Sequence, residues 1–214
     1  TGVDLAQTTL HRVAVAKNDY IYISDDAGKT WIPKASIQNW ISVSISYDGQ
    51  YISAAAEGGQ LYISSDFGDT WIPKESNREW KKISISRGFS GLTPPAVYQT
   101  AVANNGRIYK SDDYGVSWLA KDDIRNWKSV AMSADGEKQT AVVFGGGIYY
   151  SHDYGDTWTL AANTTGDWQD ISMGTDNGFA QSAILRIGEV YLSTDAGVTW
   201  NSVVVQDGAI LTSI

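Results

Sequence analysis

Five aspartates recur at one position of a repeated eight-residue segment, and carboxylates of this kind can act as general acids or nucleophiles. The segments share the pattern Ser-x-Asp-x-Gly-x-Thr/Ser-Trp, and the aspartates are Asp26, Asp66, Asp113, Asp153 and Asp195. A catalytic group is normally needed once, whereas all five copies carry the same residues. An Asp side chain can also accept hydrogen bonds from backbone N–H groups of its own turn. We therefore predict that these aspartates lock hairpin turns and do not catalyse a reaction.

The other fixed positions of the segment fit the same turn. A glycine two residues after each Asp permits a positive φ, and these glycines are Gly28, Gly68, Gly115, Gly155 and Gly197. A tryptophan opens the strand that follows and anchors the hairpin with a large apolar ring. The five are Trp31, Trp71, Trp118, Trp158 and Trp200.

This pattern resembles the Asp-box, also called the BNR repeat, of sialidases and related β-propellers. In that family the boxes lie at the blade periphery, away from the active site. Sialidases also need an arginine triad, a Tyr–Glu nucleophile pair and an Asp acid, and they use six blades and longer chains. No arginine of this chain lies in a motif that matches the arginine before the first sialidase box; the six are Arg12, Arg78, Arg87, Arg107, Arg125 and Arg186. We predict that the chain is not an enzyme, with a sialidase-like glycoside hydrolase as the third-ranked possibility.

The spacing of the boxes predicts the architecture. Their first serines stand 40 (24 to 64), 47 (64 to 111), 40 (111 to 151) and 42 (151 to 193) residues apart. Repeats of this length are typical of four-stranded propeller blades. The predicted blades cover residues 38–77, 78–124, 125–165 and 166–206, and a fifth combines 7–37 with 209–214.

The two ends of the chain lead to a prediction about closure. The N-terminal repeat begins with a second strand at residues 9–16 and lacks a recognisable first strand. Residues 209–214 stand where the first strand of another repeat would begin, with Ala209 in the place of a tryptophan. We expect the C-terminal strand to pair with the N-terminal blade, because closure removes open sheet edges. The predicted fold is all-β, a closed five-bladed propeller with four-stranded blades.

A second tryptophan series follows the boxes by nine or ten residues. It comprises Trp40, Trp80, Trp127 and Trp168, and polar residues precede these, among them Asn39, Asn126 and Asp167. An aromatic face beside an amide or carboxylate suits a sugar ring, so all seven residues are candidate ligand contacts. The alternative is that the rings pack between blades, because one Trp per blade is also what blade packing needs.

Composition excludes several classes of function. The chain has 16 basic and 24 acidic residues, a net charge of −8 and no basic run, which argues against nucleic-acid binding. No stretch is long and apolar enough to span a bilayer. His11 and His152 stand alone in different repeats, and there is no cysteine, so we predict neither a metal nor a cofactor.

These observations favour a non-catalytic binding propeller, first of all a lectin-like one with repeated carbohydrate sites on its axial face. The acidic balance favours neutral sugars over anionic ones. The alternative is a structural or protein-interaction propeller in an extracellular or virion-associated assembly. The sequence leaves the ligand and the oligomeric state open.

Overall fold

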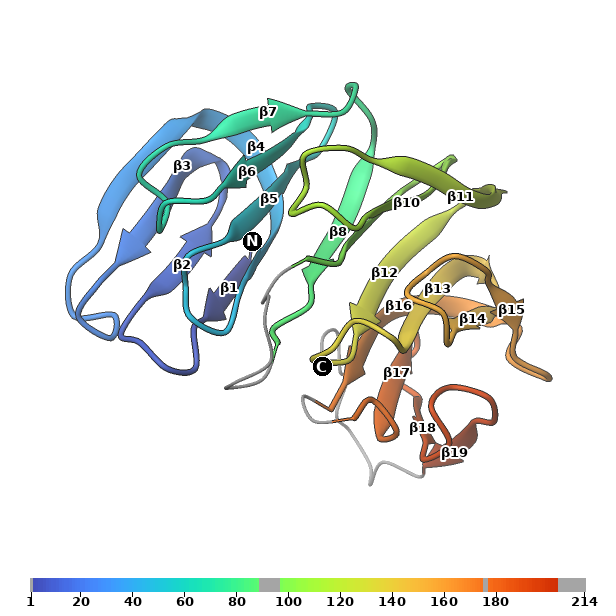
Figure 1. The fold of residues 1–214 in the computed structure, drawn as a ribbon. Helices are drawn as coiled ribbons and strands as arrows, with labels where there is room; N and C mark the ends of the chain where they lie inside the picture. The colour runs from blue at the N-terminus through green and yellow to red at the C-terminus, as the bar shows by residue number, and fades with distance from the viewer. Residues whose placement is uncertain (1, 89–96, 175–176, 204–214) are drawn as a thin grey trace.

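The computed structural model describes residues 2–88, 97–174 and 177–203, and over these ranges the chain is all β (Figure 1). The described residues contain no helix, and hence none that could cross a membrane. The strands form five units of four antiparallel strands each, and in every unit consecutive strands are paired.

The first two units share one long strand. The first unit consists of β1 (Gly2–Leu5), β2 (Arg12–Val15), β3 (Lys17–Ser24) and the first half of β4 (Ile32–Ile45). The second consists of the other half of β4, β5 (Ile52–Ala56), β6 (Leu61–Ser64) and β7 (Ile72–Lys74). The change of partner falls between Asn39, which pairs with β3, and Trp40, which pairs with β5.

The remaining three units repeat this order. The third consists of β8 (Trp80–Ile85), β9 (Gln99–Ala103), β10 (Gly106–Ser111) and β11 (Leu119–Arg125). The fourth consists of β12 (Trp127–Met132), β13 (Gln139–Gly146), β14 (Ile148–Ser151) and β15 (Thr159–Leu160). The fifth consists of β16 (Gly166–Met173), β17 (Gln181–Leu185), β18 (Val190–Ser193) and β19 (Asn201–Val203).

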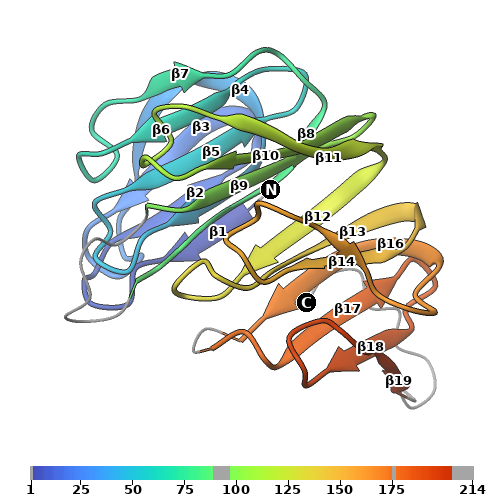
Figure 2. The same cartoon turned by 45° about the vertical axis from the view of Figure 1, so that its right-hand side comes forward.

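The first strand of each unit lies innermost and the fourth lies at the periphery (Figures 1 and 2). Neighbouring first strands contact one another in chain order, from β1 through β4, β8 and β12 to β16. Every box turn connects the third strand of a unit to its fourth, so the boxes lie away from the centre. The architecture is that of a β-propeller.

The expectation that the N-terminal repeat lacks a first strand is wrong. β1 pairs with β2 from Gly2↔Val15 to Leu5↔Arg12 and so occupies that place. It was missed because it has four residues, carries no tryptophan, and places Asp4 where the other first strands have a small residue. The proposed closing strand, residues 209–214, lies outside the described residues.

Apolar cores lie between neighbouring units. Each of the four buried clusters combines residues of two consecutive units; one, for example, joins Val102 and Ile108 of the third to Trp127 and Val130 of the fourth. Second strands such as β5 and β9 are buried along their whole length, because a unit covers each of their faces.

Buried hydrogen bonds also join the units. A hydroxyl on the second strand of one unit donates to a glutamine on the second strand of the next, at 2.7 Å in each case. The pairs are Ser53 with Gln99, Thr100 with Gln139, and Thr140 with Gln181. Such bonds make the spacing between units specific, because shifting one unit would leave a buried polar group unpaired.

Candidate functional site

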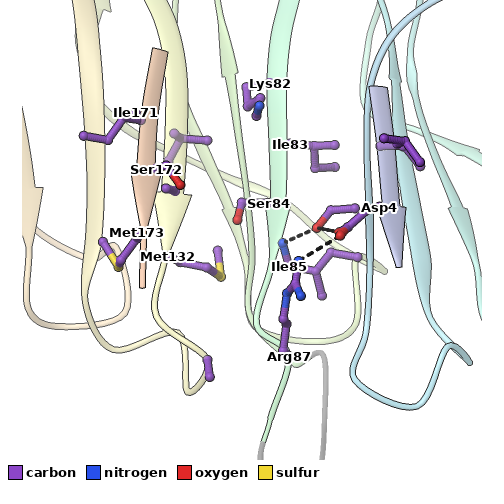
Figure 3. Close-up of a pocket in the computed structure, with 16 residues that line it drawn as sticks. Asp4, Lys82, Ile83, Ser84, Ile85, Arg87, Met132, Ile171, Ser172 and Met173 are labelled. Atoms are coloured by element: carbon purple, nitrogen blue, oxygen red, sulfur yellow. Dashed lines mark hydrogen bonds and ion pairs between the residues drawn. The ribbon is translucent and has the colours of Figure 1, made fainter. Parts of the chain in front are cut away.

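The main candidate site is a cavity of about 220 Å³ at the centre of the molecule (Figure 3). All five first strands contribute to its lining. The polar and flexible side chains among the lining residues are Asp4, Ser44, Lys82, Ser84, Arg87, Met132, Ser172 and Met173. A ligand there would contact every unit of the chain at once.

Asp4 and Arg87 form an ion pair at one end of this cavity. Arg87 Nη2 lies 2.8 Å from Asp4 Oδ1. Asp4 Oδ2 accepts hydrogen bonds from the Ile45 N–H at 3.1 Å and from Ser44 Oγ at 3.3 Å. Because both side chains are mostly buried, 15% and 25% exposed respectively, the pair holds β1 against β4 and also positions the guanidinium.

A second charged group lies at the other end of the lining. Lys82 Nζ lies 3.8 Å from Asp170 Oδ1, and the Lys82 side chain is 39% exposed. Asp170 Oδ1 also accepts hydrogen bonds from Ser129 Oγ at 2.6 Å and from the Ile171 N–H at 3.0 Å. The carboxylate is therefore held in place, whereas the ammonium keeps donors available for a ligand.

The carboxylates at this lining are engaged with the protein's own hydrogen-bond donors. Asp4 and Asp170 both serve as hydrogen-bond acceptors for the protein's own groups. Among the described residues that line the cavity there is no histidine and no aromatic ring. The described part of the chain has no cluster of three or more His, Cys, Asp and Glu side chains placed to hold a metal.

The four tryptophans proposed as ligand contacts lie inside the cores between units. Trp40, Trp80 and Trp127 are fully buried and Trp168 is 1% exposed. Each packs edge-on against a third-strand tyrosine of its own unit, with ring centroids 5.0–5.2 Å apart; these are Tyr62, Tyr109, Tyr149 and Tyr191. This placement supports the packing alternative for the series.

Two arginines cover these aromatic pairs from outside. Arg78 Cζ lies 4.4 Å from the centroid of the Tyr109 ring, and Arg125 Cζ lies 4.7 Å from that of Tyr149. Cation–π contacts of this kind stabilise the aromatic pair and block its accessible edge. Arg87 pairs with Asp4, Arg12 donates to backbone carbonyls of the first unit, and Arg107 donates to the Asp122 carbonyl. Five of the six arginines thus have separate partners, which does not resemble a convergent triad.

The polar residues that precede the tryptophans contribute mainly backbone groups. The carbonyls of Asn39, Asn126 and Asp167 accept hydrogen bonds from the N–H groups of Glu57, Phe144 and Arg186. Beside Asn39, the Glu57 carboxylate contacts Lys17 Nζ at 2.7 Å and Lys81 Nζ. Hydrogen bonds from Lys17 and then Lys81 lower the Glu57 pKa to about 2, so this carboxylate stays charged and paired.

The five boxes have one geometry, and it is that of a locked turn. In each, the Ser hydroxyl donates to the Asp carboxylate and accepts from the Gly N–H, while the Asp accepts from both the N–H and the hydroxyl of the Thr or Ser. In the third box, Ser117 Oγ lies 2.6 Å and Ser117 N 2.8 Å from the two carboxylate oxygens of Asp113. The Trp118 indole N–H donates to the Gly115 carbonyl at 3.1 Å. The Ser, Asp, Thr or Ser and Trp side chains that the motif fixes thus all form hydrogen bonds within their own turn.

These hydrogen bonds stabilise the charged form of the box carboxylates. Hydrogen bonds from Thr30, first its hydroxyl and then its N–H, lower the Asp26 pKa to about 2. At Asp113 burial opposes ionisation, but the hydrogen bonds from Ser117 and Ser111 outweigh it and the pKa is lowered. A carboxylate with a lowered pKa is a poor general acid at neutral pH, which agrees with the structural role predicted for the boxes.

The two histidines lie in different units, and each contacts a different partner. His11 Nε2 lies 3.1 Å from Asp25 Oδ1 in the first unit, and His152 Nε2 lies 2.9 Å from the Ala196 carbonyl.

Sequence reasoning did not identify the residues of the central cavity. Asp4 lies on β1, Lys82 on β8 and Arg87 just after β8, and no local motif marks them. One signal was present for Asp4, which stands where the other first strands carry the small residues Ser44, Ser84, Ala131 and Ser172.

Residues 22–31 and 149–160 match the family described as BNR/Asp-box repeat. No curated protein matches the chain. Among solved structures, an ancestral GH74 enzyme matches with a TM-score of 0.74 and 16% identity over 94% of this chain and 30% of its own. The Cps50 (Swd1) β-propeller domain of Myceliophteria thermophila matches with a TM-score of 0.69 and 10% identity over 90% of this chain and 63% of its own.

A third structure, YCF48 from Cyanidioschyzon merolae, matches with a TM-score of 0.60 and 17% identity over 94% of this chain and 83% of its own. The chain therefore spans under a third of the GH74 enzyme and less than two thirds of the Swd1 domain. At these identities the neighbours establish the fold alone, and they include an enzyme as well as other propellers. Together with the five boxes and the strand pairing, they identify the chain as an Asp-box β-propeller.

Proposed function

We propose that this chain is a non-catalytic five-bladed propeller that binds a segment of a protein partner in its central cavity. The five four-stranded units would be the blades, with boundaries close to those expected from the boxes. The observation that carries the proposal is the cavity itself, which all five first strands line with two cations, several hydroxyls and two methionines.

The chemistry of the lining favours a peptide over a sugar. Methionine side chains adapt to irregular apolar surfaces, whereas sugar sites generally present an aromatic platform. The described lining has methionines and aliphatic side chains and no ring, and the tryptophans that are candidate sugar contacts in the sequence are buried. Lys82 and Arg87 suit acceptor groups of a peptide, such as carbonyls and carboxylates.

A carbohydrate ligand remains the alternative, and one experiment separates the two. The purified protein is used to select binders from a random peptide library and, in parallel, is applied to an array of neutral glycans. Selected peptides are then titrated against Ser84→Leu, which fills the cavity, and Lys82→Gln, which removes an ammonium donor. Lys29→Gln, on an exposed box turn, is the matched control.

We expect peptides to be enriched whose binding is lost in Ser84→Leu, weakened in Lys82→Gln and unchanged in Lys29→Gln. Glycan binding without peptide enrichment would favour the lectin-like alternative. Peptide binding that is insensitive to Ser84→Leu would place the ligand outside the cavity and refute the proposal.

A further inference from the structure

A second cavity, of about 260 Å³, lies between the second and third units on the side of the box turns. Its lining includes Tyr51, Ile63, Ile72, Lys74, Tyr114 and Val116, and it shares no residue with the central cavity. We call it the Lys74 groove.

The preceding pair of units has an equivalent groove, of about 270 Å³. The strand pairs correspond, since Ile23 pairs with Ile32 as Ile63 pairs with Ile72. Both fourth strands begin with Trp-Ile-Pro-Lys, at 31–34 and 71–74. Lys34 in the first groove is therefore the counterpart of Lys74.

The first groove supplies carboxylate partners for its own basic side chains. Lys34 Nζ lies 2.7 Å from Asp69 Oδ1, and His11 Nε2 lies 3.1 Å from Asp25 Oδ1. The counterpart lysine between the third and fourth units, Lys121, has its Nζ 2.8 Å from Asp156 Oδ1. A carboxylate of the following box is thus the usual partner of this lysine.

The Lys74 groove has lost both of these acids. Val116 stands in the box position of Asp69, and Ser65 stands in the position of Asp25. Among the described residues Lys74 has no ion-pair partner, since none of the acidic side chains there lies within salt-bridge distance of it. One positive charge remains without a matching negative one.

The walls of this groove are apolar and aromatic. Tyr51 and Tyr114 stack with ring centroids 4.8 Å apart. Ile63 is buried at the base, whereas Ile72 is 56% and Val116 64% exposed. An amphipathic anion would match this surface in two ways. Its apolar part would cover the exposed apolar side chains, and its negative group would pair with the free ammonium.

We propose that the Lys74 groove binds a carboxylate carried on an aromatic or branched aliphatic body, with the carboxylate at Lys74 Nζ and the body against Ile72 and Tyr114. The ligand carboxylate would take the place that Asp69 and Asp156 occupy beside the equivalent lysines. The site is independent of the central cavity, so either proposal can fail alone.

The test uses 3-phenylpropionate as the probe, followed by NMR titration of the whole protein. Its methyl ester reports whether the charge matters. A short peptide that ends in Phe, with a free or an amidated C-terminus, reports whether a peptide carboxylate is accepted. The variants are Lys74→Gln, which removes the charge, and Val116→Asp, which restores the acid found in the other grooves; Lys34→Gln is the matched control.

We expect the acid to shift the resonances of Ile72 and Tyr114, and both variants to weaken its binding by up to about fivefold, the factor that corresponds to about 1 kcal/mol, the upper value for an exposed ion pair. Lys34→Gln should leave binding unchanged. Equal binding of the ester, an unaffected Lys74→Gln variant, or shifts confined to other surfaces would each overturn the proposal. If only the free-acid peptide binds, the natural ligand is a protein C-terminus. If only 3-phenylpropionate binds, it is a small carboxylate. Either result supports recognition of a carboxylate on an apolar body.

Discussion

Asp4 and Arg87 are 83 residues apart in the chain, and their side chains meet at 2.8 Å across the first strands of the first and third units. The same carboxylate accepts the Ile45 N–H of the strand between them. One side chain therefore joins three consecutive units. This makes the N-terminal strand β1 part of the fold and not a loose end.

Replacing Asp4 with alanine should accordingly destabilise the protein. The substitution leaves the Ile45 N–H and the Arg87 guanidinium without their acceptor, which typically costs about 1–3 kcal/mol. The free energy of unfolding from urea titration, followed by tryptophan fluorescence, measures the loss. Val3→Ala, at an exposed neighbour on the same strand, is the control and should change stability little. An unaltered urea midpoint for Asp4→Ala would show that β1 does not dock as described.

The box aspartates should affect stability and leave ligand binding intact. Asp113→Ala removes the acceptor of the Ser117 N–H and of two hydroxyls, and we expect a loss of about 1–3 kcal/mol. Binding per folded molecule, measured by calorimetry with a selected peptide, should be unchanged. If binding disappeared while stability held, the box would be part of a ligand site and the structural interpretation would be wrong.

The turn-locking role of the box aspartates could be predicted from the sequence, because their partners lie within the same eight residues, whereas the hydrogen bonds of the first Ser hydroxyl and of the Trp indole N–H were not predicted. The strand order of the last four units was likewise predictable from period-two alternation and turn residues, whereas β1 of the first unit was missed. The central cavity was not, because Asp4 of the first unit and Lys82 and Arg87 of the third unit line one space only through the arrangement of the units. The tryptophan series left two alternatives. A tryptophan such as Trp127 is expected once per unit both if it contacts a ligand and if it packs between units, so the sequence cannot distinguish the two roles, whereas the burial of the side chain can.

Acid should unfold the protein by protonating the box carboxylates. The Asp26 pKa is about 2 in the folded protein against an ordinary 3.8, and those of Asp66, Asp113, Asp153 and Asp195 are lowered as well. A lowered folded-state pKa stabilises the fold above the unfolded-state value, and that stabilisation is lost as the pH falls through the folded-state value. The urea midpoint should therefore fall between about pH 5 and pH 2.

An asparagine variant tests the assignment of this pH dependence. Asp26→Asn removes one titrating group, so its midpoint should be lower at neutral pH and fall less steeply on acidification than that of the parent. Val3→Ala, which removes no titrating group at an exposed position, is the control and should leave the slope between about pH 4 and pH 2 as it is in the parent. Parallel curves for Asp26→Asn and the parent would assign acid sensitivity to other groups.

The last prediction concerns Trp127, which lies fully buried between the third and fourth units. Truncation to alanine removes a large ring from the core and should cost about 3–5 kcal/mol, whereas Trp127→Phe keeps part of the packing and should cost less. Trp158→Ala, at a box whose ring is only partly buried, is the comparison and should cost less than Trp127→Ala. Intrinsic fluorescence during titration with neutral oligosaccharides supplies the second measurement, and no sugar-dependent change is expected in the parent. A saturable fluorescence response to a sugar that disappears in Trp127→Phe, while stability is retained, would show that this tryptophan series binds sugars. That result would favour the lectin-like alternative.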